Sequence, residues 1–323
     1  MKKIINIGVL GCASIAERSV IPAILNLPNY FKLVAVGSRS FEKSNRFSKK
    51  FNCESVDSYD KLIQRTDIDA LYIPLPTGLH DKWVNKSIKS GKHVYVEKSM
   101  GLNLSLTKEM ISNSRKHNVG LMEGYMFQYH NQHKHLKELL SKGIIGDIRH
   151  FSSSFGFPPL EQDNFRYDEK LSGGALMDSC GYPLRATFFI LGDELKVTGA
   201  SLFRNKNTGS SLYGSAYLSG EDGIGSSISF GFDNYYQCNY TIWGSKGKIT
   251  VERAFTPKPD EIPTFKLETK EGIKIIESEK DNHFEKFLIE FHNIIINKEK
   301  REKHYKEILQ QSESLQKIND LTR

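Results

Sequence analysis

Lys98, Asp178 and Tyr182 are side chains that could carry out chemistry on a carbonyl group. Lys98 follows the apolar run 93–96, so it would emerge at the end of a strand, where its ammonium could polarise a carbonyl and stabilise the developing alkoxide. Asp178 and Tyr182 are four residues apart, which places them on one face of a helix predicted over 175–191. Tyr182 could then donate a proton to a substrate oxygen. A lysine at a strand end can equally be solvated surface, and an Asp–Tyr pair can simply satisfy buried polarity.

A turn of small residues follows the first apolar run of the chain and opens the next helix. The run is 4–10, and the turn is Gly11-Cys12-Ala13-Ser14-Ile15-Ala16. Small residues let backbone N–H groups approach a pyrophosphate, which the helix N-terminus then stabilises. Alanine stands at Ala13 and Ala16, where this fingerprint usually has glycine, but the turn lies within a strand–helix–strand unit. The turn therefore predicts a dinucleotide site.

The end of the second predicted strand indicates which dinucleotide binds. Sites for NAD usually carry an acidic residue there, which bonds the ribose 2′-hydroxyl. This chain has Ser38-Arg39-Ser40 after the apolar run 33–36. A hydroxyl and a guanidinium suit a 2′-phosphate, and Lys43, one helical turn further on, could add charge. We therefore predict NADP(H), with Ser38 and Arg39 as its ligands.

The elements that must position these residues fall into two groups. Up to about residue 122, apolar runs at 4–10, 33–36, 70–73, 93–96 and 119–122 alternate with helical patterns, as in a doubly wound parallel sheet. Beyond it, short strands dominate, as in an antiparallel sheet faced by helices. We predict an α/β Rossmann domain over 1–122 and an α+β substrate-binding and oligomerisation domain over 123–323. The C-terminal helices, from Phe284 onward, could pack back on the first domain.

The second domain is predicted to hold a mainly antiparallel sheet. Asp233-Asn234 and Ser245-Lys246-Gly247 are predicted to be hairpin turns. The predicted strands are 149–155, 197–202, 211–218, 226–232, 237–243, 248–251 and 265–269. The outward face of this sheet is where we expect self-association into a homodimer or homotetramer.

Composition excludes several classes of protein. The sequence is 38% apolar and 26% charged, which is typical of a globular protein rather than a disordered one. The formal net charge is +7, but Lys and Arg are interleaved with acidic residues, so we expect no nucleic-acid partner. No apolar run approaches the length of a membrane span, so we expect no membrane partner either.

Cysteine and histidine spacing predicts neither a disulfide framework nor a metal site. The four cysteines form no CxxC pair, as expected of reduced thiols in a cytoplasmic protein. A short leader ending at Cys12 is the alternative, but Asn6 interrupts its apolar run, which a buried strand explains fully. His130, His133 and His135 lack the i,i+4 spacing of a metal-binding helix face, so we predict no metal.

Taken together, these motifs resemble the glucose–fructose oxidoreductase/inositol dehydrogenase family, often written Gfo/Idh/MocA. The resemblance covers nearly the whole chain, and its motifs are Gly11–Ala16, Pro74–His80, Gly91–Lys98, Gly173–Asp178 and Trp243–Gly247. Finer features are similar to the nucleotide-sugar 3-ketoreductases of that family. They are Gly11-Cys12-Ala13, Pro74-Leu75-Pro76, Phe165-Arg166-Tyr167, Tyr182-Pro183 (where many members carry histidine) and Arg253–Pro257.

The resemblance implies NADPH-dependent reduction of a keto group, at C3, on a nucleotide-activated deoxysugar. Lys98 would bind the ketone oxygen, and Tyr182 or Lys98 itself would protonate it. It also implies further contacts: Asp178, Arg166, Tyr236 and Thr256 with the sugar nucleotide, Arg18 with its diphosphate, and Leu75, Pro76, His80, Glu97 and Lys98 with the cofactor. Family members usually have Glu-Lys-Pro where this chain has Glu97-Lys98-Ser99, which leaves open Tyr182 as the sole proton donor.

The residues leave two other functions open. One is an NADP-dependent dehydrogenase of a free sugar, inositol or cyclic diol, for which a neutral pocket would be expected. Positive charge in the pocket would favour a nucleotide substrate instead. The other is a cofactor-binding sensor without turnover, which is compatible with the departure at Ser99.

Overall fold

The computed structural model describes residues 3–323, and the chain forms two compact units. Unit 1 comprises Met1–Gly124 and Phe284–Ser312, and unit 2 comprises Tyr125–His283 and Glu313–Arg323. The boundary predicted between residues 122 and 123 lies close to the end of the first segment. The segment Phe284–Ser312 belongs to unit 1. From the sequence alone, we assign this segment to the second domain but allow its helices to pack back on the first.

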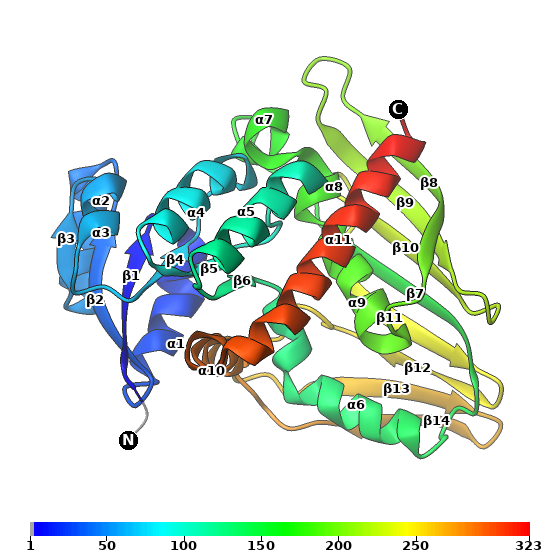
Figure 1. The fold of residues 1–323 in the computed structure, drawn as a ribbon. Coiled ribbons are helices and arrows are strands. Elements are labelled where there is room, and N and C mark those ends of the chain that lie inside the picture. The colour runs from blue at the N-terminus through cyan, green and yellow to red at the C-terminus, as the bar shows by residue number, and fades with distance from the viewer. Residues whose placement is uncertain (1–2) are drawn as a thin grey trace. The chain divides into compact units, whose positions relative to one another are not determined.

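Unit 1 is built on a six-stranded sheet in which all neighbouring strands run parallel, in the order β3-β2-β1-β4-β5-β6. The strand order reverses between β1 and β4, which is the doubly wound arrangement predicted from the sequence. The strands are β1 (Ile5–Leu10), β2 (Phe31–Gly37), β3 (Glu54–Val56), β4 (Ala70–Ile73), β5 (His93–Val96) and β6 (Leu121–Glu123). Figure 1 shows them in blue to green.

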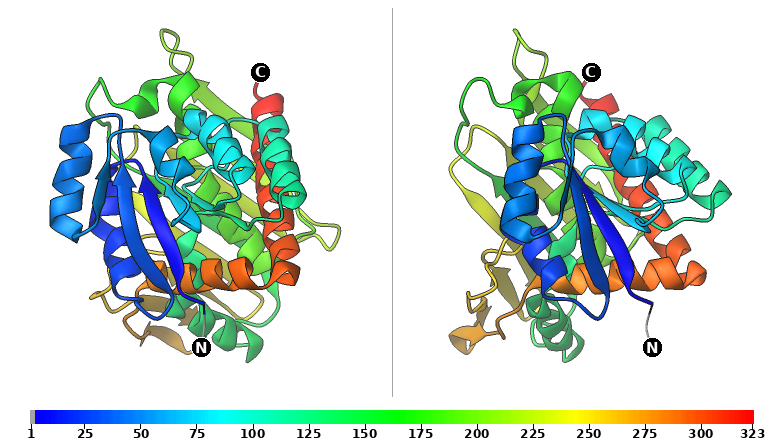
Figure 2. Two further views of the ribbon diagram at one scale, coloured as in Figure 1. Left: turned by 60° about the vertical axis from the view of Figure 1, so that its left-hand side comes forward. Right: turned by 90° about the vertical axis from the view of Figure 1, so that its left-hand side faces the viewer.

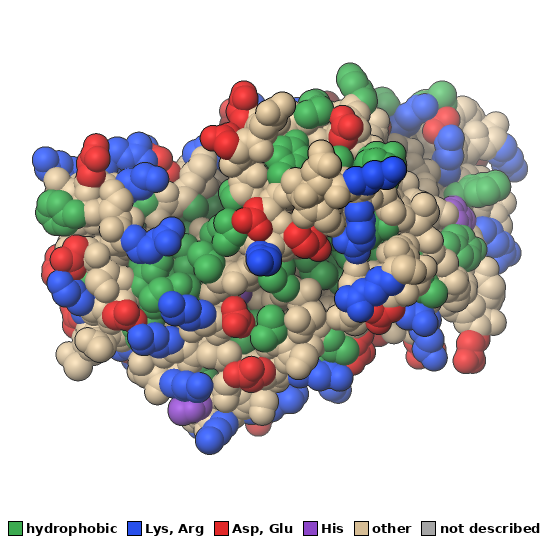
Figure 3. Space-filling view, turned by 90° about the horizontal axis from the view of Figure 1, so that it is seen from above, with side chains coloured by type: hydrophobic (Ala, Val, Ile, Leu, Met, Phe, Trp, Pro, Cys, Tyr) green, Lys and Arg blue, Asp and Glu red, His purple; other side chains and the backbone are tan. Residues whose placement is uncertain are grey.

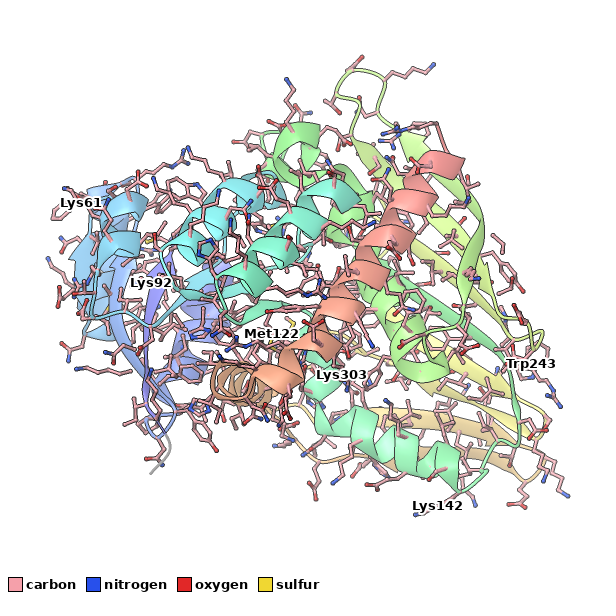
Figure 4. All side chains as sticks on the ribbon, viewed as in Figure 1. Lys61, Lys92, Met122, Lys142, Trp243 and Lys303 are labelled. Atoms are coloured by element: carbon pink, nitrogen blue, oxygen red, sulfur yellow. The ribbon has the colours of Figure 1, made fainter. Side chains whose placement is uncertain are left out.

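Helices lie on both faces of this sheet (Figure 2). The helical elements of unit 1 are η1 (Ala16–Val20), α1 (Ile21–Leu25), α2 (Phe41–Phe51), α3 (Tyr59–Gln64), η2 (Thr77–Leu79), α4 (His80–Lys89), α5 (Leu104–Lys116), α10 (His283–Ile296), η5 (Lys298–Lys300) and the first part of α11 (Arg301–Leu321). Side chains of α3, α4 and α5 form one hydrophobic core with the strands. Met122, labelled in Figure 4, lies on β6 and is almost completely buried.

The C-terminal helices are held to unit 1 by polar contacts as well as packing. The Arg301 guanidinium donates to the backbone oxygens of Ile294 and Asn118. The Tyr305 hydroxyl lies 2.7 Å from Ser114 Oγ and 3.0 Å from the Val119 carbonyl oxygen. The contacts with Asn118, Ser114 and Val119 join residues 183 to 191 positions apart, so no local pattern in the sequence could indicate them.

Unit 2 contains an eight-stranded sheet in the order β14-β13-β12-β11-β7-β10-β9-β8. All its neighbouring strands are antiparallel except β7 and β10, which are parallel, so the predicted mainly antiparallel sheet is confirmed. The strands are β7 (Ile148–Gly156), β8 (Lys196–Arg204), β9 (Ser211–Ser219), β10 (Gly225–Gly231), β11 (Gln237–Gly244), β12 (Gly247–Val251), β13 (Thr264–Thr269) and β14 (Gly272–Glu277). The helical elements are η3 (Met126–Tyr129), α6 (Asn131–Ser141), η4 (Phe165–Tyr167), α7 (Glu169–Ser172), α8 (Gly174–Asp178) and α9 (Gly181–Leu191).

The hairpin predicted at Asp233-Asn234 is wrong. The strands on either side of it, β10 and β11, are not paired with each other, because β7 lies between them. At one end of the sheet, Gly156 of β7 is the register partner of both Gly231 and Gln237. The short connection therefore crosses the end of a strand that comes some 80 residues earlier. The second predicted turn, Ser245–Gly247, does join an antiparallel pair, β11 and β12.

The single helix predicted over 175–191 is also wrong, because it is interrupted at Ser179 and Cys180. Pro183 has no backbone N–H, so it could not donate to the Ser179 carbonyl in a continuous helix, and its ring would crowd that carbonyl. Pro183 is instead accommodated in the first turn of a new helix, α9. Asp178 therefore ends one helix while Tyr182 lies at the start of the next, and they do not share a helix face.

The surface and the helices give two further findings. On the face shown in Figure 3, Lys and Arg side chains of the described residues are dispersed among Asp and Glu. Among residues 3–323, no helix combines the length and the apolar character that crossing a membrane would need.

Candidate active site

The small-residue turn after β1 has the backbone shape that a dinucleotide site requires. Gly11 has φ +128°, and a Cβ there would lie 2.9 Å from Leu75 Cδ2, so a side chain at this position would be both strained and crowded. Cys12, Ala13, Ser14 and Ile15 are half-buried or exposed, whereas Ala16 is fully buried and opens η1. Backbone N–H groups at such a helix start have no intrahelical partner, so the turn can hold a pyrophosphate.

A group of basic residues lies at the carboxyl end of β2. Ser38 is buried, and its hydroxyl accepts a hydrogen bond from the Ser40 N–H at 3.1 Å. Arg39 is exposed. Burial raises the pKa of the Tyr59 phenol, and the Arg39 guanidinium lowers it by a smaller amount. Burial likewise raises the pKa of Cys12, against the lowering effects of Ser38, Arg46 and Lys43.

This basic group fits the 2′-phosphate of NADP(H). Arg39, Lys43 and Arg46 bring three cations to the region of Cys12 and Ser38. The nearby carboxylate, Glu17, is paired with Arg46 at 3.1 Å and with Lys50 at 2.9 Å. None of the three residues after β2, Ser38-Arg39-Ser40, is acidic, so this segment lacks the carboxylate that would bond the ribose 2′-hydroxyl of NAD(H).

Lys98 lies directly after β5, in a segment held by buried groups of unit 1. The peptide bond between Lys98 and Ser99 is cis. His80 is fully buried, with Nδ1 2.8 Å from the Ser99 carbonyl oxygen and Nε2 2.7 Å from the Leu75 carbonyl oxygen. The Met100 N–H donates to Glu123 at 2.6 Å. His80, predicted as a cofactor contact, thus ties the segment that contains Lys98 to the loop after β4.

Glu97, another predicted cofactor contact, points its carboxylate at two tyrosines. Oε1 accepts a hydrogen bond from the Tyr72 hydroxyl at 2.7 Å and from the Tyr95 hydroxyl at 3.2 Å. Sequence reasoning missed both tyrosines. The available signal was their position, since Tyr72 and Tyr95 occupy the third residue of two apolar strand segments and are register partners in neighbouring strands.

In unit 2, Asp178 forms an ion pair with Arg166. Arg166 Nε donates to Asp178 Oδ2 at 2.8 Å, and its guanidinium lies 4.8 Å from the centre of the Phe165 ring. The hydroxyls of Ser172 and Ser210 bond the Arg166 carbonyl oxygen, which fixes this backbone. The structure thus brings two predicted substrate contacts, Arg166 and Asp178, into one ion pair.

Tyr182 lies in a cluster of aromatic side chains within unit 2. Its ring centre is 4.7 Å from that of Phe155, 5.6 Å from those of Tyr125 and Phe255, and 6.1 Å from that of Phe127. Only 6% of the residue is exposed. The Tyr182 ring is therefore held among aromatic side chains of unit 2.

Tyr236 and Thr256, also predicted as substrate contacts, lie together. The Tyr236 hydroxyl is 3.3 Å from Thr256 Oγ1, and Arg253 donates to the same hydroxyl at 3.2 Å. Arg253 has φ +48°, which non-glycine residues seldom adopt. Sequence reasoning named Arg253 only as part of a motif and not as a site residue. Arg18, in unit 1, is exposed on η1.

The histidines considered for a metal site have other surroundings. His133 Nδ1 is 2.7 Å from the Tyr240 hydroxyl, and its Nε2 is 3.0 Å from the Ala254 carbonyl oxygen. Burial lowers the pKa of His133 to about 3. Within residues 3–323, no group of three or more His, Cys, Asp or Glu side chains is arranged to hold a metal ion.

The fold and these residues define a two-domain oxidoreductase with a dinucleotide-binding first domain. Residues 5–125 match the oxidoreductase family with an NAD-binding Rossmann fold, GFO_IDH_MocA, and residues 133–250 match the GFO/IDH/MocA C-terminal domain. The chain belongs to the GFO/IDH/MocA family.

Within this family, the chain is similar to sugar 3-ketoreductases. It is 41% identical over 270 residues to the dTDP-3,4-didehydro-2,6-dideoxy-α-D-glucose 3-reductase of Saccharopolyspora spinosa, covering 84% of this chain and 81% of that one. For the Streptomyces violaceoruber protein of the same name the identity is 39% over 270 residues, covering 83% and 78%. A crystal structure of KijD10, a 3-ketoreductase from Actinomadura kijaniata in complex with NADP and TDP-benzene, superimposes with a TM-score of 0.96 at 32% identity, covering 99% of this chain and 98% of that one.

Proposed function

We propose that this protein reduces the C3 keto group of a nucleotide-activated deoxysugar with NADPH. It is an NADP-dependent oxidoreductase acting on CH–OH and ketone groups. The observation that carries the proposal is the similarity to proteins named as 3-ketoreductases, which extends over both units of this chain. The predicted site residues also lie in both units. The basic group at the end of β2 supports NADP(H) over NAD(H).

The residues of unit 1 would hold the cofactor. The turn Gly11–Ala16 would bind the pyrophosphate, and Ser38 and Arg39, with Lys43, would bind the 2′-phosphate. NADPH, when bound, supplies the hydride. Lys98 would bind the ketone oxygen and stabilise its developing negative charge, because an ammonium is worth most where charge appears during the reaction.

The residues of unit 2 would bind the sugar nucleotide. Asp178, held by Arg166, would orient the sugar hydroxyls, while Tyr236 and Thr256 would add further contacts, and Arg18 of unit 1 would contact the diphosphate. Tyr182, or Lys98 itself, would give the proton to the alkoxide oxygen. A phenol held rigidly by aromatic neighbours is suited to this step because little ordering is required when the substrate binds.

Replacement of Lys98 tests the proposal. With a dTDP-linked 3-keto deoxysugar as substrate, Lys98→Ala should lower kcat by at least about 100-fold, the loss typical of removing an oxyanion stabiliser. NADPH binding, followed by fluorescence, should persist in this variant. The control is Lys89→Ala, which replaces an exposed lysine at the end of α4 and should keep the wild-type rate. A wild-type rate in Lys98→Ala would contradict the assignment, and turnover of free sugars alone would contradict the nucleotide substrate.

Assembly and location belong to the same proposal. The outer face of the unit 2 sheet carries exposed aromatic side chains, which supports a homodimer or homotetramer formed through that face. All four cysteines, Cys12, Cys53, Cys180 and Cys238, are free thiols, which supports a cytoplasmic location.

A further inference from the structure

The segment 253–256, which follows β12 in unit 2, carries Thr256 and lies beside Tyr236, the two residues that the proposed function assigns to substrate binding. Arg253 donates to the Tyr236 hydroxyl at 3.2 Å, and Thr256 Oγ1 lies 3.3 Å from the same hydroxyl. Thr256 Oγ1 is also 3.4 Å from Cys238 Sγ. The backbone between Arg253 and Thr256 determines where these groups lie, so whatever fixes that backbone also shapes this part of the site.

The backbone of this segment starts in a strained conformation. Arg253 has φ +48°, in the left-handed region that non-glycine residues seldom adopt because their Cβ crowds the backbone. At the next residue, the Ala254 N–H donates to the Cys238 carbonyl oxygen at 2.7 Å, and Ala254 is completely buried. The hydrogen bonds of the Ala254 backbone therefore help to hold the strained conformation.

A buried histidine of α6 binds the carbonyl side of Ala254. His133 Nε2 lies 3.0 Å from the Ala254 carbonyl oxygen, and His133 is completely buried. A carbonyl oxygen only accepts hydrogen bonds, so Nε2 must carry the hydrogen. The Gln132 side-chain amide approaches the same oxygen at 3.4 Å, which is a longer contact. His133 is therefore the closer side-chain donor to this carbonyl.

The Tyr240 hydroxyl supports this arrangement of the His133 ring. His133 Nδ1 lies 2.7 Å from that hydroxyl, and because the hydrogen is on Nε2, Nδ1 accepts from the Tyr240 O–H. Burial lowers the pKa of His133 to about 3, so the ring is neutral at physiological pH. Tyr240 is itself almost completely buried on β11. Two successive hydrogen bonds therefore connect β11, through α6, to the Ala254 carbonyl.

Phe255, in the middle of the segment, is held in a different way. Its ring is completely buried, with ring centres 5.1 Å from Phe127, 5.7 Å from Phe155 and 5.6 Å from Tyr182. Hydrophobic packing is non-directional, so it keeps Phe255 in the core but does not set the rotation of the neighbouring peptide groups. The contact between Phe255 and Tyr182 should therefore survive an exchange of His133.

We propose that His133 is a positioning residue, which fixes the segment 253–256 in its substrate-binding conformation through its hydrogen bond to Ala254. The inference rests on the proposed function, because it takes Tyr236 and Thr256 as substrate contacts. Since His133 is completely buried, it acts through the segment. Its loss should therefore weaken binding of the sugar nucleotide and leave the chemical step unchanged.

Replacement of His133 tests this role. His133→Phe keeps an aromatic ring in the core but removes the donor to Ala254, so KM for a dTDP-linked 3-keto deoxysugar should rise by roughly 10-fold, the effect of about one lost hydrogen bond. We expect kcat to stay close to the wild-type value. The Kd for NADPH should also be unchanged, because the residues proposed to bind it lie in unit 1. Hydrogen exchange of the backbone amides in 252–257 should become faster.

Two amide exchanges separate the two hydrogen bonds of His133. The longer side chain in His133→Gln can still donate to Ala254, so it should recover most of the wild-type KM and hydrogen exchange. The shorter side chain in His133→Asn can reach Tyr240 but not Ala254, so KM should rise as in His133→Phe. If His133→Phe does not fold, His133→Asn is measured in its place.

The double variant His133→Phe/Tyr240→Phe separates positioning from stability. His133→Phe leaves the buried Tyr240 hydroxyl without its acceptor, which lowers the free energy of unfolding. Adding Tyr240→Phe removes that hydroxyl and should restore part of the stability, because neither partner is then left unsatisfied. KM should stay high, because Ala254 still lacks its donor. A KM that recovers together with the stability would overturn the inference.

Leu218→Ala is the matched control. Leu218 is completely buried on β9 of unit 2 and lies outside the core cluster that contains Ala254. Its truncation should lower the stability but leave KM and the hydrogen exchange of 252–257 unchanged.

Several outcomes would count against the inference. A wild-type KM in folded His133→Phe would overturn it, and so would unchanged hydrogen exchange of 252–257 or an equal rise of KM in Leu218→Ala. Full activity of Lys98→Ala would instead overturn the proposed function. Because hydrogen exchange is measured without substrate, the two failures are distinguishable.

Discussion

At the scale of single residues, we expect Arg39 to decide which nicotinamide cofactor binds. It is exposed at the end of β2, next to the buried Ser38, and the cations Lys43 and Arg46 act on the same region. A guanidinium can bond a phosphate with two parallel N–H groups, but it gains little from a ribose hydroxyl. We therefore predict that the preference for NADP(H) depends on the Arg39 side chain, supported by the charges of Lys43 and Arg46.

Arg39→Ala should weaken NADPH binding far more than NADH binding. Loss of a hydrogen-bonded charge pair costs about 1.5–3 kcal/mol, which corresponds to a roughly 10- to 100-fold higher Kd for NADPH. Titration followed by nucleotide fluorescence measures both constants. Lys49→Ala, an exposed lysine at the far end of α2, serves as the control and should change neither. Equal losses for the two nucleotides would be incompatible with a 2′-phosphate contact.

At the scale of elements, the break between α8 and α9 separates two predicted site residues. Asp178 ends α8 and is bound by Arg166, whereas Tyr182, in the first turn of α9, packs in the aromatic cluster. Gly181 begins α9, and a Cβ there would overlap the Tyr125 hydroxyl and approach its Cζ to 2.8 Å. The break thus lets α9 approach Tyr125 closely and fixes where the Tyr182 ring lies.

Gly181→Ala should destabilise the protein even though alanine is the better helix former. Helix propensity alone predicts a gain of up to about 1 kcal/mol, whereas overpacking costs about 1–3 kcal/mol. The free energy of unfolding in urea measures the balance. Gly199→Ala on β8, where nothing lies within 4 Å of an added Cβ, should be neutral or stabilising. A stabilising effect of Gly181→Ala would mean that α9 does not depend on this close approach.

At the scale of the whole molecule, the two faces of the unit 2 sheet have opposite character. The face that packs on α8 and α9 is apolar and buried. The other face has serines at its centre, where Ser152 pairs with Ser227 and Ser154 with Ser229. Exposed aromatic side chains flank this centre: Phe203, Tyr213, Tyr217 and Trp243. A surface of small residues flanked by exposed aromatic rings suits the sheet of a second copy.

Trp243→Glu should convert the proposed oligomer into a monomer, because a buried carboxylate without a partner would be costly in such an interface. Trp243, labelled in Figure 4, lies near the end of β11 and is 60% exposed in the single chain. Light scattering after size exclusion should then give 36.8 kDa rather than a multiple of it. Phe41→Glu on α2 changes an equally exposed aromatic residue of unit 1 and should leave the mass unchanged. A wild-type protein of monomeric mass would contradict the proposed assembly.

Several elements could be predicted closely because they depend on local pattern. The strands 70–73 and 93–96 match β4 and β5 residue for residue, since a strand buried on both faces is a short, continuous apolar run. The short strand β3 was missed because its three residues are too few to carry a periodic signal. The helix α3 was missed although its buried residues Tyr59, Leu62 and Ile63 have the i, i+3, i+4 spacing of a helix face. Of the candidate site, the positions of Lys98 and of Ser38-Arg39 at strand ends followed from the same local pattern.

The sequence by itself determined the parallel sheet, the dinucleotide turn and the residue types offered at the strand ends, because each depends on neighbours within about one strand–helix unit. Only the tertiary structure decided which side chains meet. It placed Arg166 on Asp178, Tyr72 and Tyr95 on Glu97, and β7 between β10 and β11. These pairings join segments that are 2 to about 80 residues apart in the chain. They form when elements pack on the two faces of a sheet. The hydrophobic pattern of the sequence drives this packing but does not specify which side chains become partners.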